Sequence, residues 1–210
     1  SFKNANIDGA RFAFANLDNS NLLDKTDLSN INLAGIDLSN MNFKGRNLSD
    51  TILIGADLTD TMLTGVDLSG ANLSHVDLSE HDLTGTNLSN TILFRTDLSG
   101  IDLRTITLDN ANFRYAILSG SKLPDSLLVN NNLDHAILNN INFAGKDLSK
   151  SSFQRVDLEG SDMQNTNLSG AAFIEVDFTK IKNKSLAGAD LTDTSFAHSN
   201  LSGVNLAGTI

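Results

Sequence analysis

Residues 65–90 read GVDLSGANLSHVDLSEHDLTGTNLSN, and every fifth residue of this stretch, beginning at Leu68, is leucine. The spacing continues from Leu23 to Phe178, where thirty-two consecutive fifth residues are twenty-five Leu, six Phe and Met163. Five residues rotate an α-helix about 140° away from the starting face, and they end on the opposite face of a β-strand. Neither element keeps these side chains together, so the backbone must turn once per five residues.

The residues before each large apolar residue indicate how this turn is made. Two places earlier stands a small or β-branched residue, as at Ala56, Val66 and Thr91, and one place earlier usually stands Asp or Asn. Residues two apart share a strand face, so the large and the small residue point inward while Asp or Asn points outward. Ser, Thr or Gly, which favour turns, come next. Each repeat is therefore predicted to be a short strand and a corner.

These repeats resemble the pentapeptide-repeat family, whose motif is A-(D/N)-L-X-X. The resemblance rests on stretches such as GADLTDT at 55–61 and GSDMQNTNLSGAAF at 160–173, and it covers nearly all 210 residues. It implies an all-β fold, a right-handed quadrilateral β-helix in which four repeats form one coil. On this resemblance, residues 1–210 form a single solenoid of about ten coils, with adjacent strands about 4.8 Å apart.

Two interruptions shift the phase of the repeat. The large residues before Leu23 are Phe2, Ile7, Phe12 and Leu17. One residue is therefore added near 19–22. After Phe178 the next large residue is Leu186, so three residues are added within 179–184, a stretch that carries three lysines. We expect a bulge at the first interruption and a solvated loop at the second.

Composition and motifs exclude several classes of protein. The net charge is −10, but 22 of the 25 acidic residues are Asp, whose short side chain accepts hydrogen bonds from backbone N–H groups in turns. No apolar run approaches the roughly 18 residues that span a bilayer. The chain has no cysteine, no phosphate-binding loop and no dinucleotide motif, and its four histidines are widely separated. We predict no catalytic residue, no cofactor and no metal site here, although a catalytic domain outside this segment is possible.

Sorting the repeats in steps of twenty separates the four predicted faces. One face has Asp at six of its eight outward positions: Asp37, Asp57, Asp77, Asp97, Asp157 and Asp177. We call this set the acidic ladder. Stacked like charges repel one another unless they are screened or hydrogen-bonded. Two interpretations stay open, namely aspartates that cap turns, which we favour, and an imitation of a DNA phosphate strand.

The neighbouring face departs most from the plain repeat, because several of its outward residues are not turn formers. We call these candidate partner-binding residues the candidate set: Ile52, Ile54, His75, Ile92, Phe94, Arg95, Arg114, Tyr115, His135 and Arg155. Arginine and aromatic residues are enriched at interface hot spots, which favours a partner surface. The alternative is that these side chains only pack on one another and stabilise one edge.

Two functions remain open. The first is a non-catalytic protein-interaction or scaffold domain, the repeat segment of a larger bacterial protein such as a secreted effector, because neither end of the repeats shows a capping segment. The second is implied by resemblance to quinolone-resistance pentapeptide proteins, which bind DNA gyrase and topoisomerase IV as DNA mimics. Arg95, Arg114 and Arg155 would interrupt such a mimic's field, and the negative charge opposes direct nucleic-acid binding. We expect a soluble protein, bacterial cytoplasmic or secreted, with a protein partner.

Overall fold

A computed structural model of the chain describes residues 2, 5–15, 22, 27–130 and 132–210. The backbone packs as two compact units. Unit 1 comprises Ser1–Asp97 and Thr105–Asn112, and unit 2 comprises Leu98–Arg104 and Phe113–Ile210. The expectation of one continuous domain over 1–210 stays a prediction.

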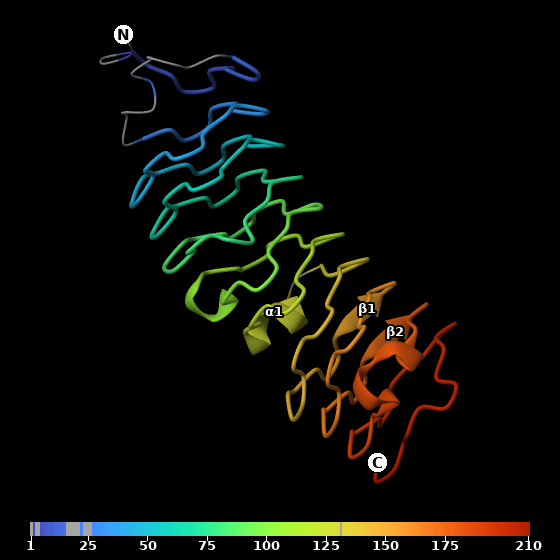
Figure 1. The fold of residues 1–210 in the computed structure, drawn as a ribbon. Helices are drawn as coiled ribbons and strands as arrows, with labels where there is room; N and C mark the ends of the chain where they lie inside the picture. Colours follow the sequence, from blue (N-terminus) through green and yellow to red (C-terminus); the bar gives the residue numbers. More distant parts are fainter. Residues whose placement is uncertain (1, 3–4, 16–21, 23–26, 131) are drawn as a thin grey trace. The chain divides into compact units, whose positions relative to one another are not determined.

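Both units consist of coils of extended backbone stacked in parallel, as Figure 1 shows. In unit 1, parallel bridges join residues twenty apart, such as Ile52 with Asn72, and in unit 2 Ile117 with Ile137. The N–H of Leu53 donates to the carbonyl of Asn72 at 2.8 Å, and the N–H of Asn72 donates to the carbonyl of Thr51 at 2.8 Å. One turn of the backbone thus takes four five-residue repeats, and the fold is a β-helix solenoid.

The large residue of each repeat lies in the interior of its unit. In unit 1, Leu33, Leu53 and Leu73 are fully buried. In unit 2 the corresponding positions include Phe153 and Phe173, whose rings are stacked with centroids 4.9 Å apart. Polar residues at the small inward position use neighbouring carbonyls, as Thr86 Oγ1 donates to the carbonyl of Leu63 at 2.9 Å. A threonine is therefore compatible with this core.

The corners are built by two features of the repeat. The outward Asp or Asn accepts a hydrogen bond from the backbone N–H two residues later, as Asn47 Oδ1 does from Ser49 at 3.0 Å. The second residue after the large one has a left-handed backbone, for example Gly65 at φ +67° and Asn90 at φ +59°. Glycine and asparagine adopt this conformation most easily. Local sequence preferences therefore agree with the coil geometry.

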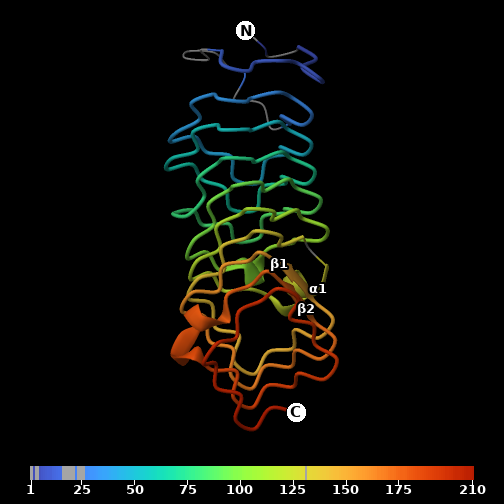
Figure 2. The same ribbon diagram turned by 90° about the vertical axis from the view of Figure 1, so that its right-hand side faces the viewer.

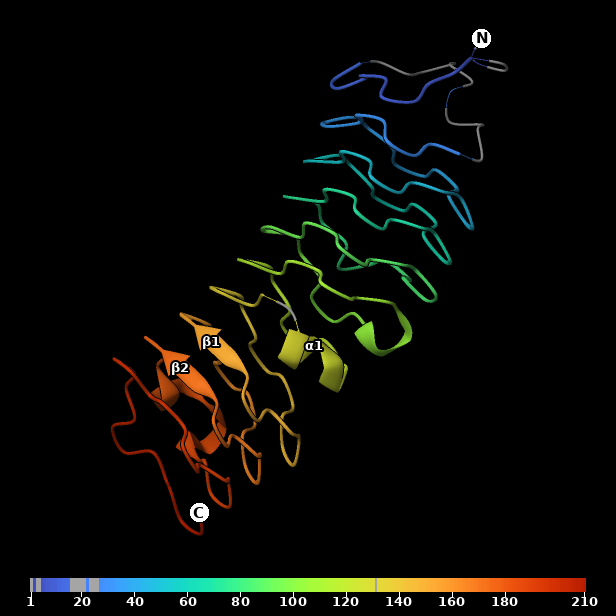
Figure 3. The same cartoon turned by 180° about the vertical axis from the view of Figure 1, so that it is seen from behind.

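Regular strands occur only where the bridges are continuous. In unit 2, β1 (Ser152–Gln154) pairs in parallel with β2 (Ala172–Ile174), with Phe153 opposite Phe173. Figure 3 shows the two strands side by side on successive coils. Elsewhere in the described chain the strands are shorter, because each repeat contributes one bridging residue between two corners.

The helix α1 (Asp125–Asn130) differs from the expected corner. The period of five continues through Leu123, Leu128 and Leu133, so the sequence phase predicts an ordinary repeat here. Instead Leu127 and Leu128 are both buried, and the chain coils outside the plain repeat, visible at α1 in Figure 1. Pro124 has no N–H for a ladder bond, and Asp125 is acidic in the first turn, which suits a helix start.

The expected loop at 179–184 forms two short 3₁₀ turns, η2 (Phe178–Lys180) and η3 (Lys182–Lys184). Figure 2 shows them, in orange, projecting from the coils of unit 2. Bridges across this stretch join residues twenty-three apart, as Asp177 with Asn200, whereas Ser185 and Asn205 are again twenty apart. Lys182 Nζ lies 2.9 Å from Asp162 Oδ2. A third turn, η1 (Leu103–Thr105), carries Arg104, which pairs with Asp102.

The first predicted interruption lies mostly outside the described residues. Only Leu22 of 19–22 is described, and it is buried. The bridge between Arg11 and Asn32 joins residues twenty-one apart, one more than usual.

Candidate functional site

Five residues of the candidate set stand at the left-handed corner position, and we call them the left-handed column, with one part in each unit. The part in unit 1 contains His75 and Arg95, with φ of +63° and +56°. The part in unit 2 contains Tyr115, His135 and Arg155, with φ of +62°, +60° and +53°. These residue types do not favour turns, yet the structure places them in the turns themselves. A left-handed residue other than glycine or asparagine costs about 1–2 kcal/mol.

In unit 1 the column is held by an aromatic contact. The rings of His75 and Phe94 meet edge to face with centroids 5.7 Å apart. The guanidinium carbon of Arg95 lies 5.4 Å from the centroid of the Phe94 ring, within range of a cation–π interaction. Phe94 is half-buried, and His75 and Arg95 are exposed. Successive coils thus place an imidazole, a phenyl ring and a guanidinium in one cluster.

Three isoleucines of unit 1 are exposed on the same face. Ile52, Ile54 and Ile92 have exposed fractions of 38%, 39% and 41%. Ile52 and Ile92 occupy the outward position of the repeat, in a column where they alternate with Asn32, Asn72 and Asn112. The candidate set in unit 1 therefore combines apolar side chains with one cation and one imidazole.

In unit 2 the column is a stack of planar groups. The rings of Tyr115 and His135 are parallel within 8°, with centroids 4.3 Å apart. The guanidinium carbon of Arg114 lies 5.5 Å from the Tyr115 ring centroid. Tyr115 and His135 are half-buried, whereas Arg114 is exposed. Coil spacing brings residues twenty apart into direct contact.

Arg155 continues this column through an ion pair that sequence reasoning missed. Its Nε donates to Glu175 Oε2 at 2.7 Å, and its Nη2 donates to Glu175 Oε1 at 2.8 Å. The hydrogen bond from Arg155 lowers the pKa of Glu175 below its usual value, with smaller contributions from His198 and His135. Glu175 follows Arg155 by twenty residues, and this spacing was the available signal.

The acidic ladder is divided between the units. In unit 1, Asp37 and Asp57 each accept a hydrogen bond from the N–H two residues later, at 2.9 Å. Asp77 accepts from both the N–H and the hydroxyl of Ser79, and these bonds lower its pKa. The bond from Thr59 likewise lowers the pKa of Asp57. These three carboxylates therefore cap turns.

The ladder nevertheless stacks acid directly on acid. Asp37 bridges Asp57, and Asp77 bridges Asp97. On another face of unit 1, Asn47 follows Asp27, and its Nδ2 donates to Asp27 Oδ1 at 3.0 Å. The ladder has no asparagine to provide this bond.

In unit 2 the acidic ladder is interrupted. Ile117 and Ile137 bridge each other, and Ile137 bridges Asp157. Asp157 accepts from the N–H of Glu159 at 3.1 Å, and Asp177 accepts from Thr179 at 3.0 Å. The hydroxyl of Thr179 donates to Asp177 and lowers the pKa of that carboxyl group. The two acids cap turns here as well.

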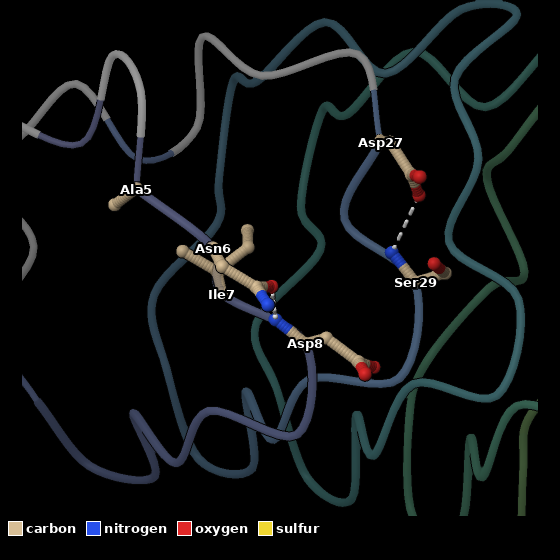
Figure 4. Close-up of a pocket in the computed structure, with 6 residues that line it drawn as sticks. All are labelled: Ala5, Asn6, Ile7, Asp8, Asp27 and Ser29. Carbon is tan, nitrogen blue, oxygen red and sulfur yellow. Dashed lines mark hydrogen bonds between the residues drawn. The ribbon is translucent and has the colours of Figure 1, made fainter.

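Other parts of the described chain offer little chemistry. Figure 4 shows a pocket of about 190 Å³ in unit 1, where Asn6 and Asp27 accept hydrogen bonds from the N–H groups of Asp8 and Ser29. Two of its polar side chains therefore cap turns. No group of three His, Cys, Asp or Glu in the described residues could hold a metal ion. In this same part of the chain, no helix has the length and apolar character to cross a membrane.

His81 occupies the small inward position of its repeat and is half-buried. Its Nε2 lies 2.7 Å from the carbonyl oxygen of Leu58 and 3.1 Å from Thr61 Oγ1. Its Nδ1 is buried and has no hydrogen-bond partner among the described residues.

Comparison with known proteins agrees with this geometry. The pentapeptide-repeats family model matches in eight copies, the first at 23–60 and the last at 183–210, which together span 23–210. The structure of trypsin-treated QnrB1, a plasmid-mediated fluoroquinolone resistance protein, matches with TM-score 0.64 and 18% identity over 85% of this chain and 88% of that chain. At this identity the likeness concerns the fold.

A second structure with which the chain shares 26% identity is that of HetL. HetL is a pentapeptide repeat protein involved in heterocyst differentiation regulation, from the cyanobacterium Nostoc sp. strain PCC 7120. Its match has TM-score 0.42 and covers 94% of this chain and 83% of that chain. No curated protein matches the chain. The resemblance identified from the sequence is confirmed by the family match, and the chain belongs to the pentapeptide-repeat family.

Proposed function

We propose that the chain is a non-catalytic protein-interaction domain, which holds a protein partner through side chains of the candidate set. The proposal includes a right-handed, four-sided β-helix of about ten coils. We also propose that the chain is the repeat segment of a larger bacterial protein, for example a secreted effector. Membership of a repeat family and coils with filled interiors support this proposal.

The observation that carries it is the left-handed column. Each of His75, Arg95, Tyr115, His135 and Arg155 stands where glycine or asparagine would adopt the same backbone without strain. The strain is about 1–2 kcal/mol per residue. An aromatic pair such as Tyr115 with His135 contributes about 0.5–1.5 kcal/mol. This contribution does not exceed the backbone strain of the two left-handed residues that make the contact. Stability alone does not favour these side chains over the ordinary turn residues.

The test removes the column without disturbing the turns. We expect the Arg95→Asn/Tyr115→Asn/Arg155→Asn variant to fold as well as the parent and to lose partners that the parent retains from bacterial or host lysate. A matched control is Asp60→Asn/Lys150→Asn, which changes left-handed residues on other faces. If the triple variant captured the same proteins as the parent, the column would have no role in partner binding.

The charge distribution favours a second candidate, a DNA mimic that binds DNA gyrase or topoisomerase IV. Fourteen acidic and six basic residues give unit 1 a net charge of −8, whereas eleven acidic and nine basic residues give unit 2 a net charge of −2. Two stacked pairs, Asp37 with Asp57 and Asp77 with Asp97, lie in unit 1. The fold shared with a fluoroquinolone resistance protein agrees with this candidate.

A DNA supercoiling assay separates the two candidates. A mimic would inhibit gyrase or protect it from a quinolone, and Asp57→Asn/Asp77→Asn/Asp97→Asn would weaken that effect. No effect of the purified chain at high concentration would remove the second candidate and leave the first intact.

A further inference from the structure

A four-residue motif occurs twice in unit 1. Residues 51–54 read TILI and residues 91–94 read TILF, whereas the repeat between them, 71–74, reads ANLS. Because Ile52 bridges Asn72 and Asn72 bridges Ile92, the two motifs lie two coils apart on one face. We call Ile52, Ile54, Ile92 and Phe94 the apolar stripe.

The first residue of each motif is structural, and the second is exposed. Thr51 and Thr91 are buried, and their hydroxyls donate to the carbonyls of Leu48 and Leu88 at 2.7 and 2.6 Å. Ile52 and Ile92 keep 38% and 41% of their surface exposed. Beside Ile54, a Cβ at Gly55 would meet nothing within 4 Å, so the corner is open. The apolar stripe is therefore accessible to a partner.

The stripe is unfavourable for the isolated fold. In the same column, Asn32 and Asn72 accept hydrogen bonds from the N–H groups of Ala34 and Ser74 at 3.0 and 3.1 Å. An isoleucine side chain has no acceptor, so Ile52 and Ile92 cannot cap their turns. They also expose apolar surface to water. Asparagine would serve the fold better at both positions.

The spacing of the stripe distinguishes between kinds of partner. Two coils span about 9.6 Å at a strand separation of about 4.8 Å. Residues seven apart on an α-helix are about 10.5 Å apart along its axis and lie on one face. Residues on one face of a β-strand recur at about 6.6 Å and about 13 Å. A helix lying along the stacking direction therefore matches the two motifs, and a strand does not.

The charges beside the stripe are one cation, Arg95 on the Phe94 ring, and the more numerous aspartates of the neighbouring face, which indicate the polar flank of such a helix. Asp57 and Asp77 follow the stripe around the coil, their carboxylates cap turns, and Asp97 stacks on Asp77. Unit 1 as a whole has a net charge of −8. A helix with lysine or arginine beside its apolar face would be attracted to this surface, and one with acidic flanks would be repelled.

We infer that the apolar stripe of unit 1 binds a basic amphipathic α-helix, with apolar residues seven apart seated at the two TIL motifs. This inference rests on the proposed function and specifies its partner. It names the structural class and the charge of the bound segment.

The probe is a synthetic helical peptide of about 21 residues with Leu at i, i+3, i+7, i+10 and i+14, Lys beside this face and Ala elsewhere. Fluorescence anisotropy measures its affinity, and circular dichroism measures the helicity it gains on binding. One control peptide has the same composition with the Leu residues distributed around the helix. A second alternates Leu and Lys and forms a strand.

The matched protein variants exchange residues at the same position of the repeat. Ile52→Asn/Ile92→Asn inserts the residue that the column already has at Asn32 and Asn72, and it leaves the charge unchanged. The control is Met62→Asn, an outward residue on another face that is 57% exposed and bridges Asn42. We expect the double variant to bind the patterned peptide at least about tenfold more weakly, equal to about 1.4 kcal/mol, and the control to bind within about twofold.

Several outcomes would overturn the inference. Equal binding of the patterned and permuted peptides would reduce the effect to charge attraction, and tighter binding of the alternating peptide would indicate a strand. Absence of binding by the patterned peptide would also contradict it. The sedimentation coefficients of the parent and of Ile52→Asn/Ile92→Asn are compared without peptide. A lower value for the variant would show that a second copy of the chain covers the stripe.

The inference can fail separately from the proposed function. If no helical peptide binds but the double isoleucine variant or the Arg95/Tyr115/Arg155 variant loses captured proteins, the interaction domain stands and the helix is wrong. If capture depends on neither variant, the proposed function fails as well.

Discussion

The imidazole of His135 lies parallel to the phenol ring of Tyr115 at 4.3 Å between centroids, although both residues have left-handed backbones. The two positions are twenty residues apart, and the N–H of Tyr115 donates to the carbonyl of Asp134 at 3.0 Å. The backbone hydrogen bond between the two coils therefore holds the rings in contact. A favourable side-chain contact and an unfavourable backbone conformation coexist at the same residues.

Replacing His135 separates these two contributions. His135→Ala loses the stack and keeps the left-handed strain, so we expect a loss of about 0.5–1.5 kcal/mol in unfolding free energy. His135→Asn loses the stack but relieves strain, so it should be more stable than the alanine variant by about 1 kcal/mol. Urea unfolding of the three proteins measures both differences. Equal stability of the alanine and asparagine variants would show that the backbone is not strained.

Phe173 is expected to be the most sensitive core position of unit 2. Its ring contacts those of Phe153, Phe178 and Phe196 at 4.9, 5.0 and 5.6 Å, and it is fully buried. Phe173→Ala should cost about 3–5 kcal/mol, because it removes buried surface and leaves a cavity. Thermal unfolding followed by circular dichroism tests this. A cost below about 1 kcal/mol would mean that the coils close around the missing ring.

Leu127 distinguishes α1 from an ordinary repeat. The repeat phase places Leu127 at the outward position, where asparagine is common, but the structure buries it completely. Leu127→Asn should therefore cost about 2–4 kcal/mol, since it removes apolar burial and places an amide in the interior. Met62→Asn, at the same repeat position but 57% exposed, should change stability by less than about 0.5 kcal/mol. Similar effects of both changes would argue against the helix.

Stability should fall in acid because turn-capping carboxylates must be protonated. Hydrogen bonds lower the pKa of Asp57 and Asp77 from 3.8, the value for an unfolded chain. The unfolded chain then binds more protons, so stability rises with pH, is fully present above the unfolded value and is lost as pH falls through the folded value. Urea midpoints should increase from about pH 2 to about pH 5 and then level.

The double variant Asp57→Asn/Asp77→Asn tests the origin of this dependence. Asparagine keeps the cap, as Asn47 does for Ser49, but it cannot be protonated in this range. We expect a shallower rise of the urea midpoint between about pH 2 and about pH 5 than in the parent. If the urea midpoint of the variant rose with pH as steeply as that of the parent, other carboxylates would cause the loss of stability in acid.

The solenoid follows from the amino-acid sequence, because its cause lies within each group of five residues. A large residue such as Leu53, a buried Thr51 and a left-handed Gly55 recur at one spacing, and strand alternation and turn chemistry leave one arrangement of inside and outside. The stacked faces follow from the same count, because each coil takes twenty residues. For this reason the sequence alone predicts which side chains share a face.

Features that depend on contacts between neighbouring coils are visible only in the three-dimensional structure. The phase through Leu123, Leu128 and Leu133 is unbroken, yet α1 forms there because Leu127 finds space in the interior, which periodicity does not report. Whether Arg155 faces solvent or Glu175 depends on the directions of side chains on two successive coils. In the structure, Arg155 Nε lies 2.7 Å from Glu175 Oε2. Local preferences determine where a backbone turns, and packing between coils determines which side chains meet.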